Sequence, residues 1–342
     1  MANCNNLFKN FNNNLSITKT KKDRLITSKG ELRKKIKDHF AAKHPEYVPK
    51  FRIQGSYILG TMIRTKDDTC DLDNGIYFFP KPKVSGTILQ GWIWDAVEDA
   101  TTQKPDHRKK CIRVIYKNDY HIDLPVYYKL CENNDAEKPH VAVKDGEWLL
   151  SDPKEFQAWF NKQKDKEGQL KKIVRYLKAW CDKMNKKMPN GLAMTVLAEG
   201  NIVYNERDDI SLRDTLQAIE KTLKNEWKCI MPTTPQNDLF DTYKGDKNYF
   251  FGCLKDFISD ADNAIDFEKN QLKASKLWQA HQGIYFPDGE DADVDDKLNQ
   301  LINKAFLLKE NKAQTSTAGV IVNTGTGVVN NPLHKFYSED EE

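Results

Sequence analysis

Two short acidic stretches, each merging into apolar residues, constrain the fold of this chain more than any other feature. The run from Asp71 to Phe79 alternates polar and apolar residues at its start and then becomes apolar, which predicts a β-strand. Residues two apart on a strand share a face, so the carboxylates of Asp71 and Asp73 should point the same way, roughly 7 Å apart along the backbone. Residues 120–128 predict a second strand, from which Asp123 can join the pair.

A glycine–serine turn, Gln54-Gly55-Ser56-Tyr57, precedes the first acidic strand. Such a turn exposes backbone N–H groups, which proteins use to hold phosphate. Mg²⁺ prefers oxygen ligands and bridges carboxylates to substrate phosphates, so three carboxylates beside this turn predict a site for divalent cations and a nucleoside triphosphate. In a two-metal phosphoryl transfer, Asp71 and Asp73 would hold both ions. Asp123 would complete one ion's ligands or accept a proton.

These strings are short, and the alternative is a turn, a surface strand and an unrelated aspartate. The apolar strand context of Asp123 favours the chemical interpretation. His121 shares a strand face with Asp123 and is a candidate general base. We favour a strand-anchoring role for it, because two-metal transfer needs no histidine.

The chain's 342 residues suffice for two lobes. Its 53 Lys and Arg against 50 Asp and Glu give a net charge of +3, which makes no case for nucleic-acid binding. Seven cysteines without a Cys-x-x-Cys pair argue against a zinc site or a disulfide framework and favour a reducing cytoplasm. No signal-peptide pattern and no apolar run of ~18 residues occur, which predicts a soluble cytoplasmic protein without a membrane partner.

The patterns divide the chain into three parts. Residues 1–150 predict a catalytic lobe, with residues 1–15 irregular and a long N-terminal helix from about Thr18 to His44, interrupted near Ser28–Gly30. Residues 151–312 predict a helical lobe, because apolar residues recur there at helical spacing. The Thr-, Gly- and Val-rich residues 313–342 predict a flexible tail.

With these residues placed, the chain resembles the cGAS/DncV-like nucleotidyltransferase (CD-NTase) family, especially its bacterial cyclic GMP–AMP synthases. The resemblance covers about residues 50–200. Single strings are common, but several in the family's order are specific. They are Phe51–Ser56 with Thr61 and Arg64, Asp71–Gly75, His121–Tyr127, Trp148–Lys154 and Arg175–Trp180, with a looser match at Leu277-Trp278 and Gly283–Phe286.

The resemblance implies an α+β fold. A polymerase-β-like nucleotidyltransferase lobe with a mixed sheet would be followed by a helical lobe, with the active site in the cleft between them. It places Asp71, Asp73 and Asp123 on a catalytic triad that holds two Mg²⁺ ions, for which Mn²⁺ can substitute. The nucleotide-binding residues that it implies are Gln54, Gly55, Ser56, Tyr57, Arg113, Ser151, Asp152 and Lys178.

The chain departs from the family's pattern at two places that bear on base choice. Leu59 stands where the bacterial synthases have a tyrosine, and residues 189–192 lack the expected serines.

The resemblance further implies a bacterial cyclic oligonucleotide synthase that joins NTPs, ATP and GTP first among them, into cyclic GMP–AMP and releases pyrophosphate. This second messenger would serve anti-phage (CBASS) signalling. The implied partners are a downstream effector activated by the cyclic nucleotide and an E1/E2-like conjugating partner at the C-terminus. Two alternatives stay open: a nucleotidyltransferase acting on an RNA, a protein or a small molecule, and a catalytically silent nucleotide-binding sensor.

Overall fold

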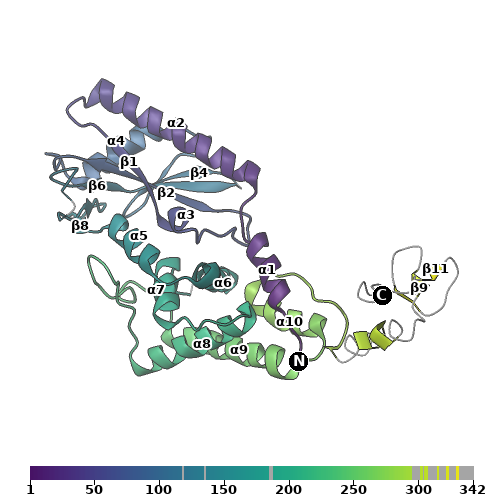
Figure 1. Cartoon of the computed structure of the whole chain (residues 1–342). Coiled ribbons are helices and arrows are strands. Elements are labelled where there is room, and N and C mark those ends of the chain that lie inside the picture. The colour runs from purple at the N-terminus through teal and green to yellow at the C-terminus, as the bar shows by residue number, and fades with distance from the viewer. Residues whose placement is uncertain are drawn as a thin grey trace, which may run out of the picture.

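The computed structural model of the chain describes residues 1–117, 119–134, 136–184 and 188–294. Beyond these it describes residues 301–302 and 304–306 and three short strands, β9 (Gln314–Thr315), β10 (Ile321–Val322) and β11 (Val329–Asn330), that pair with one another. The predicted tail of residues 313–342 therefore lies mostly outside the described residues. The main body consists of two lobes, one built on a sheet and one built of helices (Figure 1).

The first lobe contains an 8-stranded mixed sheet. Its central strand β2 (Asp71–Phe78) runs parallel to β5 (Tyr120–Leu124) and β6 (Val126–Tyr128) and antiparallel to β1 (Lys50–Gln54). β4 (Ile112–Tyr116) pairs antiparallel with β5 and forms a hairpin with it. The remaining strands are β3 (Asp106–His107), β7 (His140–Val141) and β8 (Leu149–Leu150).

Two helices cover the face of this sheet that lies away from the helical lobe, α2 (Lys19–Lys43) and α4 (Gly86–Val97) (Figure 1). The buried side of α2 carries Leu25, Leu32, Ile36 and Phe40. The predicted interruption near Ser28–Gly30 is wrong. Gly30 faces open space and Ser28 hydrogen-bonds the Tyr120 hydroxyl at 3.0 Å, so neither residue breaks the helix.

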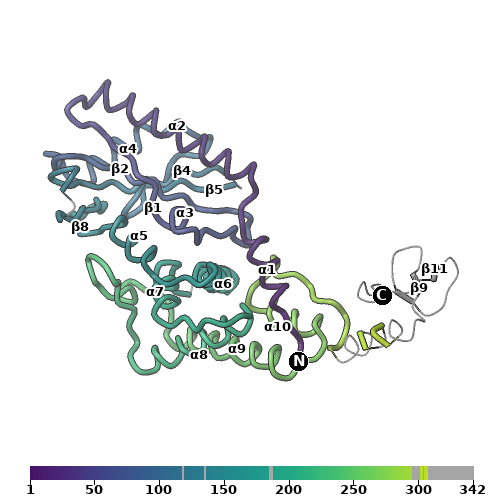
Figure 2. Tube along the Cα trace, in the orientation of Figure 1, coloured from purple at the N-terminus to yellow at the C-terminus, as the bar shows by residue number. Residues whose placement is uncertain are grey.

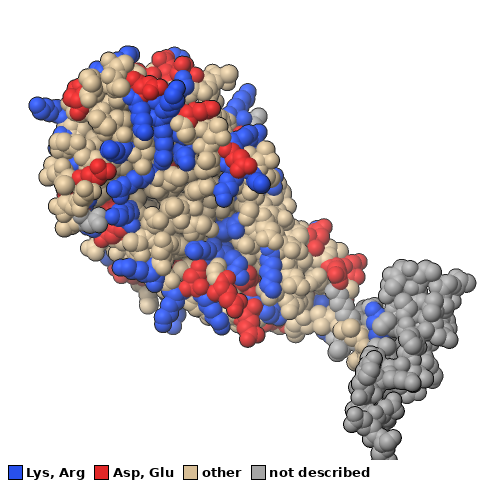
Figure 3. Space-filling model, turned by 45° about the horizontal axis from the view of Figure 1, so that its top comes forward, with Lys and Arg blue, Asp and Glu red and all other residues tan. Residues whose placement is uncertain are grey.

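The outer surface of the sheet lobe mixes basic and acidic side chains (Figure 3). On α2, Arg24 pairs with Asp119 at 2.9 Å and Lys35 pairs with Asp99 at 2.9 Å. These two basic side chains of the helix therefore lie beside carboxylates at the surface. Among the described residues, no helix is long and apolar enough to span a membrane.

The second lobe is helical, as predicted from the spacing of its apolar residues. It begins at α5 (Pro153–Lys162), whose first turn is capped by Asp152 Oδ1 accepting from the Glu155 N–H at 3.0 Å. The helices that follow are α6 (Gln169–Lys183), α7 (Gly191–Asn201), α8 (Asp208–Asn225), α9 (Lys247–Asp262) and α10 (Gln271–Gln282), with single turns at Lys166–Gly168 and Asn263–Phe267.

The first helix, α1 (Asn5–Asn14), lies in the stretch that was expected to be irregular, so that expectation is wrong. Asparagine is a poor helix former, but Phe8 and Phe11 on one side of the helix are fully buried against the helical lobe. The ring of Phe8 lies 4.8 Å from that of Trp278 and 5.1 Å from that of Tyr176. Tertiary packing therefore overrides local propensity here.

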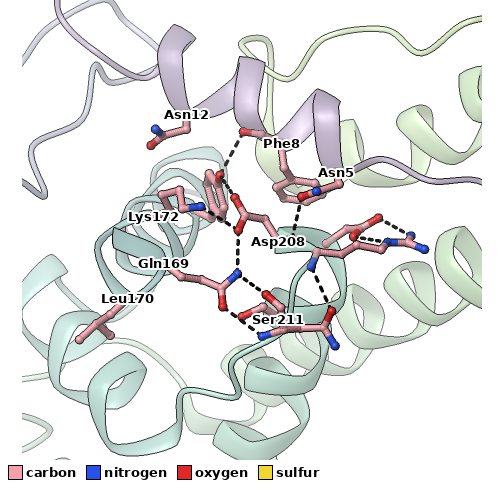
Figure 4. Close-up of polar contacts among 12 residues, drawn as sticks. Asn5, Phe8, Asn12, Gln169, Leu170, Lys172, Asp208 and Ser211 are labelled. Carbon is pink, nitrogen blue, oxygen red and sulfur yellow. Dashed lines mark hydrogen bonds and ion pairs between the residues drawn. The ribbon is translucent and has the colours of Figure 1, made fainter. Parts of the chain in front are cut away.

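Polar contacts hold α1 onto the helical lobe as well (Figure 4). The Asp208 N–H donates to Asn5 Oδ1 at 2.9 Å, and the Tyr176 hydroxyl donates to the Phe8 carbonyl at 3.0 Å. The buried carboxylate of Asp208 accepts from Gln169 and Lys172 at 2.8 and 3.0 Å. These bonds satisfy buried polar groups that would otherwise destabilise the lobe.

The N-terminal segment thus belongs to both lobes. α1 packs against α8 and α6 of the helical lobe, with Phe8 reaching Trp278 of α10, and the chain then passes directly to α2 on the sheet lobe (Figure 2). At the junction, Arg175 of α6 donates to Asn12 and Ser16, and the Arg64 N–H donates to the Leu15 carbonyl at 2.8 Å.

Candidate active site

The register of the central strands brings the three predicted carboxylates together. In the parallel pair of β2 and β5, Asp73 lies opposite Asp123 and Asp71 lies opposite His121. All three aspartates line one cavity of about 540 Å³ between the two lobes. The helical lobe closes its other side with residues such as Phe156 and Leu192.

The carboxylates differ in their electrostatic surroundings. Burial raises the pKa of Asp73 to about 7, and the negative charges of Asp123 and Asp71 add to this rise. Burial acts in the same direction on Asp71, but the hydrogen bond from His121 at 3.0 Å and the positive charge of Arg113 outweigh it and lower its pKa. His121 therefore contacts a triad carboxylate rather than only anchoring its strand.

Arg113 forms a two-pronged ion pair with Asp123. The antiparallel register of β4 and β5 sets the two residues opposite each other. Nε of Arg113 lies 2.6 Å from Oδ1 of Asp123, and Nη2 lies 2.7 Å from Oδ2. Burial opposes the charge on Arg113, but the bonds to Asp123 keep its pKa above the ordinary value.

The donor set suits a hard divalent cation. Carboxylate oxygens are the ligands that Mg²⁺ prefers, and a cation would relieve the mutual repulsion that raises the pKa of Asp73. Nevertheless, within the described part of the chain no three His, Cys, Asp or Glu side chains are arranged to hold one cation. Both oxygens of Asp123 accept from Arg113 instead. The metal assignment of the three aspartates stays a prediction.

The glycine–serine turn opens a short helix, α3 (Gly55–Leu59), directly after β1. Gly55 has φ 68°, and a Cβ atom there would lie 1.9 Å from Oδ2 of Asp73. The turn therefore lies against the half-buried carboxylate of Asp73 through a position that only glycine can occupy. Gly55 and Ser56 line the cavity, whereas Tyr57 packs against the sheet-lobe core and has Lys22 Nζ at 6.0 Å from its ring centroid.

Gln54, the last residue of β1, holds the start of the turn through side-chain hydrogen bonds. Its side-chain N–H donates to the Tyr127 hydroxyl at 2.9 Å, and its side-chain oxygen accepts from the Tyr77 hydroxyl at 3.2 Å. Gln54 also lines the cavity, and its amide is committed to this buried network in the cavity wall. Ser151 also hydrogen-bonds Tyr127, which links the turn to the start of the helical lobe.

Lys178 of α6 brings a cation from the helical lobe to the cavity. Its ammonium donates to the carbonyl and the hydroxyl oxygen of Thr61, at 3.1 and 3.2 Å. Burial lowers its pKa to about 8, although the charge of Asp73 opposes this shift. Asp152 also lines the cavity, but its carboxylate caps α5 and lies 3.5 Å from the Lys138 ammonium.

Sequence reasoning missed part of the cavity wall. A loop of the helical lobe supplies Met231, Thr234, Asn237 and Leu239, and α5 supplies Gln157. The Thr234 N–H donates to Glu155 at 3.1 Å, which fixes the loop to α5. No periodic pattern marks such a loop, because a distant contact determines its position.

Comparison with known proteins agrees with this geometry. Residues 49–127 match the family described as "Cyclic GMP-AMP synthase DncV-like, nucleotidyltransferase domain". A cyclic GMP–AMP synthase of Escherichia albertii is 29% identical over 238 residues, which cover 60% of this chain and 51% of that protein. The cyclic GMP–AMP synthase of Vibrio cholerae serotype O1 is 25% identical over 52% of this chain and 53% of that protein. The chain spans about half the length of these curated relatives.

Solved structures show the same fold. The V. cholerae cyclic AMP–GMP synthase DncV has a TM-score of 0.68 at 19% identity, covering 84% of this chain and 98% of that one. A mutant of the same enzyme in complex with ATP, GTP and a further ligand has a TM-score of 0.73 at 18% identity, covering 84% and 97%. The predicted α+β fold is confirmed. With residues 49–127 matched to that nucleotidyltransferase domain, the chain is similar to the cGAS/DncV-like nucleotidyltransferases.

Proposed function

We propose that this protein is a cyclic dinucleotide synthase that joins ATP and GTP into cyclic GMP–AMP. One observation carries the proposal: Asp71, Asp73 and Asp123 line a single interlobe cavity beside a glycine–serine turn. Relatives named cyclic GMP–AMP synthases, and a related structure with ATP and GTP, support it. Other cyclic di- or trinucleotides are the next candidates.

The chain's own residues have separable roles in this proposal. The backbone of Gly55 and the hydroxyl of Ser56 bind the donor triphosphate, and Lys178 adds a positive charge from the opposite lobe. Asp71, Asp73 and Asp123 would hold Mg²⁺, which supplies charge neutralisation and activation of the attacking hydroxyl. Closure of the cavity by both lobes keeps the two reacting groups oriented.

The proposal extends to a signalling role. The cyclic product would act as a second messenger in CBASS anti-phage defence and activate a separate effector. Conjugation of the C-terminus by an E1/E2-like partner is a further part of the proposal.

Product analysis tests the function directly. Purified protein incubated with labelled NTPs and Mg²⁺ should convert label from ATP and GTP together into a phosphatase-resistant product. Mass spectrometry should give the mass of cyclic GMP–AMP, and nuclease sensitivity defines the linkage. Linear product alone would rule out ring closure, and protein-linked label alone would show an acceptor other than a second nucleotide. No incorporation at all would favour a silent nucleotide-binding sensor.

Gly55→Ala should reduce product formation at least about 100-fold, because the added methyl group displaces the Asp73 carboxylate that it would meet at 1.9 Å. Gly60→Ala is the matched control. Gly60 has a similar φ of 71°, but its nearest neighbour, Lys171 Cδ, would lie 3.8 Å from the new Cβ. Initial rates and melting temperatures of both variants are the measurements. Equal rates for the two variants would contradict a role for the close contact with Asp73.

A further inference from the structure

Arg113 covers the carboxylate that a metal site would need. Its guanidinium donates to both oxygens of Asp123, at 2.6 and 2.7 Å, and Nη2 lies 3.8 Å from Oδ2 of Asp71. The side chains of Arg113 and Asp123 are only 15% and 13% exposed. Such a bidentate, partly buried pair is stronger than a surface ion pair and holds both groups in one geometry.

This arrangement opposes cation binding in two ways. A carboxylate whose two oxygens both accept from one guanidinium has its strongest acceptor directions occupied. A divalent cation on Asp123 would also meet the positive charge of Arg113 within a few ångströms, in a site shielded from water.

The same guanidinium can bind phosphate. Arginine's planar fork matches a phosphate group as well as it matches a carboxylate. Arg113 lies on β4 and contacts Asp123, which lines the cavity together with the glycine–serine turn and Lys178. A nucleotide entering this cavity brings phosphates that can take over the bonds that Asp123 now accepts.

We infer that Arg113 is an internal counter-ion of Asp123, which it must release before a divalent cation binds, and that nucleotide phosphates take up the released guanidinium. Cation binding and nucleotide binding are therefore coupled through the Arg113 side chain. This inference rests on the proposed function only in taking the aspartates as metal ligands. Without nucleotide, the Arg113–Asp123 pair keeps cation affinity low. When nucleotide phosphates bind the guanidinium, Arg113 no longer competes with the cation for Asp123.

Mn²⁺ titration of the nucleotide-free protein, followed by the electron paramagnetic resonance signal of free Mn²⁺, tests the competition. Arg113→Gln should bind Mn²⁺ at least about tenfold more tightly than wild type, because the competing charge is gone. Arg113→Lys keeps the charge without the fork and should give a smaller gain. Arg24→Gln removes the exposed pair with Asp119 on α2 and should leave Mn²⁺ affinity unchanged. Unchanged or weaker binding in Arg113→Gln would overturn the inference.

A second measurement tests whether the Arg113 guanidinium moves from Asp123 to the nucleotide phosphates. Adding α,β-methylene-ATP should tighten Mn²⁺ binding more in wild type than in Arg113→Gln, since only the wild type has a guanidinium to transfer. An equal gain in both proteins would overturn the coupling. Combining Arg113→Gln with Asp123→Asn should abolish the gain of the single variant, and its persistence would place the extra Mn²⁺ elsewhere.

Two comparisons distinguish a failure of the inference from a folding defect and from a failure of the proposed function. If Arg113→Gln melts far below wild type, Arg113→Lys decides the test, and a Mn²⁺ affinity equal to wild type then overturns the inference. Failure to form cyclic product would overturn the proposed function while leaving the Mn²⁺ titrations interpretable. Unchanged Mn²⁺ affinities with normal product formation would overturn only the role of Arg113.

Discussion

Asp73→Asn should lower the rate of product formation at least about 1000-fold, the equivalent of roughly 4 kcal/mol of lost transition-state stabilisation. Asp73 is the middle carboxylate of the predicted triad and lies against the glycine–serine turn at Gly55. Its asparagine replacement keeps the shape of the side chain but not its charge. The melting temperature in metal-free buffer should stay equal or rise, because the substitution removes a buried charge that its neighbours repel.

Loss of activity with unchanged stability in Asp73→Asn would show that Asp73 acts in the reaction and not in folding. Asp99→Asn is the matched control, since the side chain of Asp99 is 79% exposed and pairs only with Lys35 at the surface. It should leave both rate and melting temperature unchanged. Wild-type product formation by Asp73→Asn would refute the metal assignment, and a large drop in its melting temperature would point to a structural role.

Phe8→Ala should lower the free energy of unfolding by about 3–5 kcal/mol, the range found when a buried phenylalanine is truncated. The ring is fully buried and lies within 6.4 Å of Phe11, Tyr176, Trp278 and Phe286. The lost contacts leave a cavity between α1 and the helical lobe. Urea denaturation followed by tryptophan fluorescence measures the change, because Trp278 lies directly beside the cavity.

Phe267→Ala makes the same chemical change at a side chain that is 73% exposed. It should alter stability by no more than about 0.5 kcal/mol. If Phe8→Ala were as mild as this control, α1 would contribute little to the helical lobe and its observed docking would be energetically unimportant.

The sequence could predict the elements whose signals are local. The acidic strands and the helices after residue 150 follow from apolar periodicity, which depends only on neighbouring residues. Helix α1 could not be predicted in this way. Its asparagines argue against a helix, and the burial of Phe8 and Phe11 depends on residues more than 150 positions away.

The candidate site likewise contains residues that local motifs predict and contacts that only the tertiary structure determines. The three aspartates, Gly55 and Ser56 are short-range motifs, and they line the same cavity in the structure. The contacts that modify them depend on register and tertiary packing. The fork from Arg113 to Asp123 exists because β4 and β5 pair with these residues opposite, and Gln54 is committed to Tyr127 and Tyr77 by the packing of the sheet.

The passage of the chain from α1 to α2 has a mechanical consequence. The lobes are joined by backbone at residues 15–18 and again at residues 150–153, and each short link can extend by only about 10 Å. Two short links of limited span prevent the lobes from separating in parallel and leave rotation about the line that joins the links. Substrate entry and product release should therefore occur as the lobes rotate about this line. The cavity should open widest at the rim farthest from that axis.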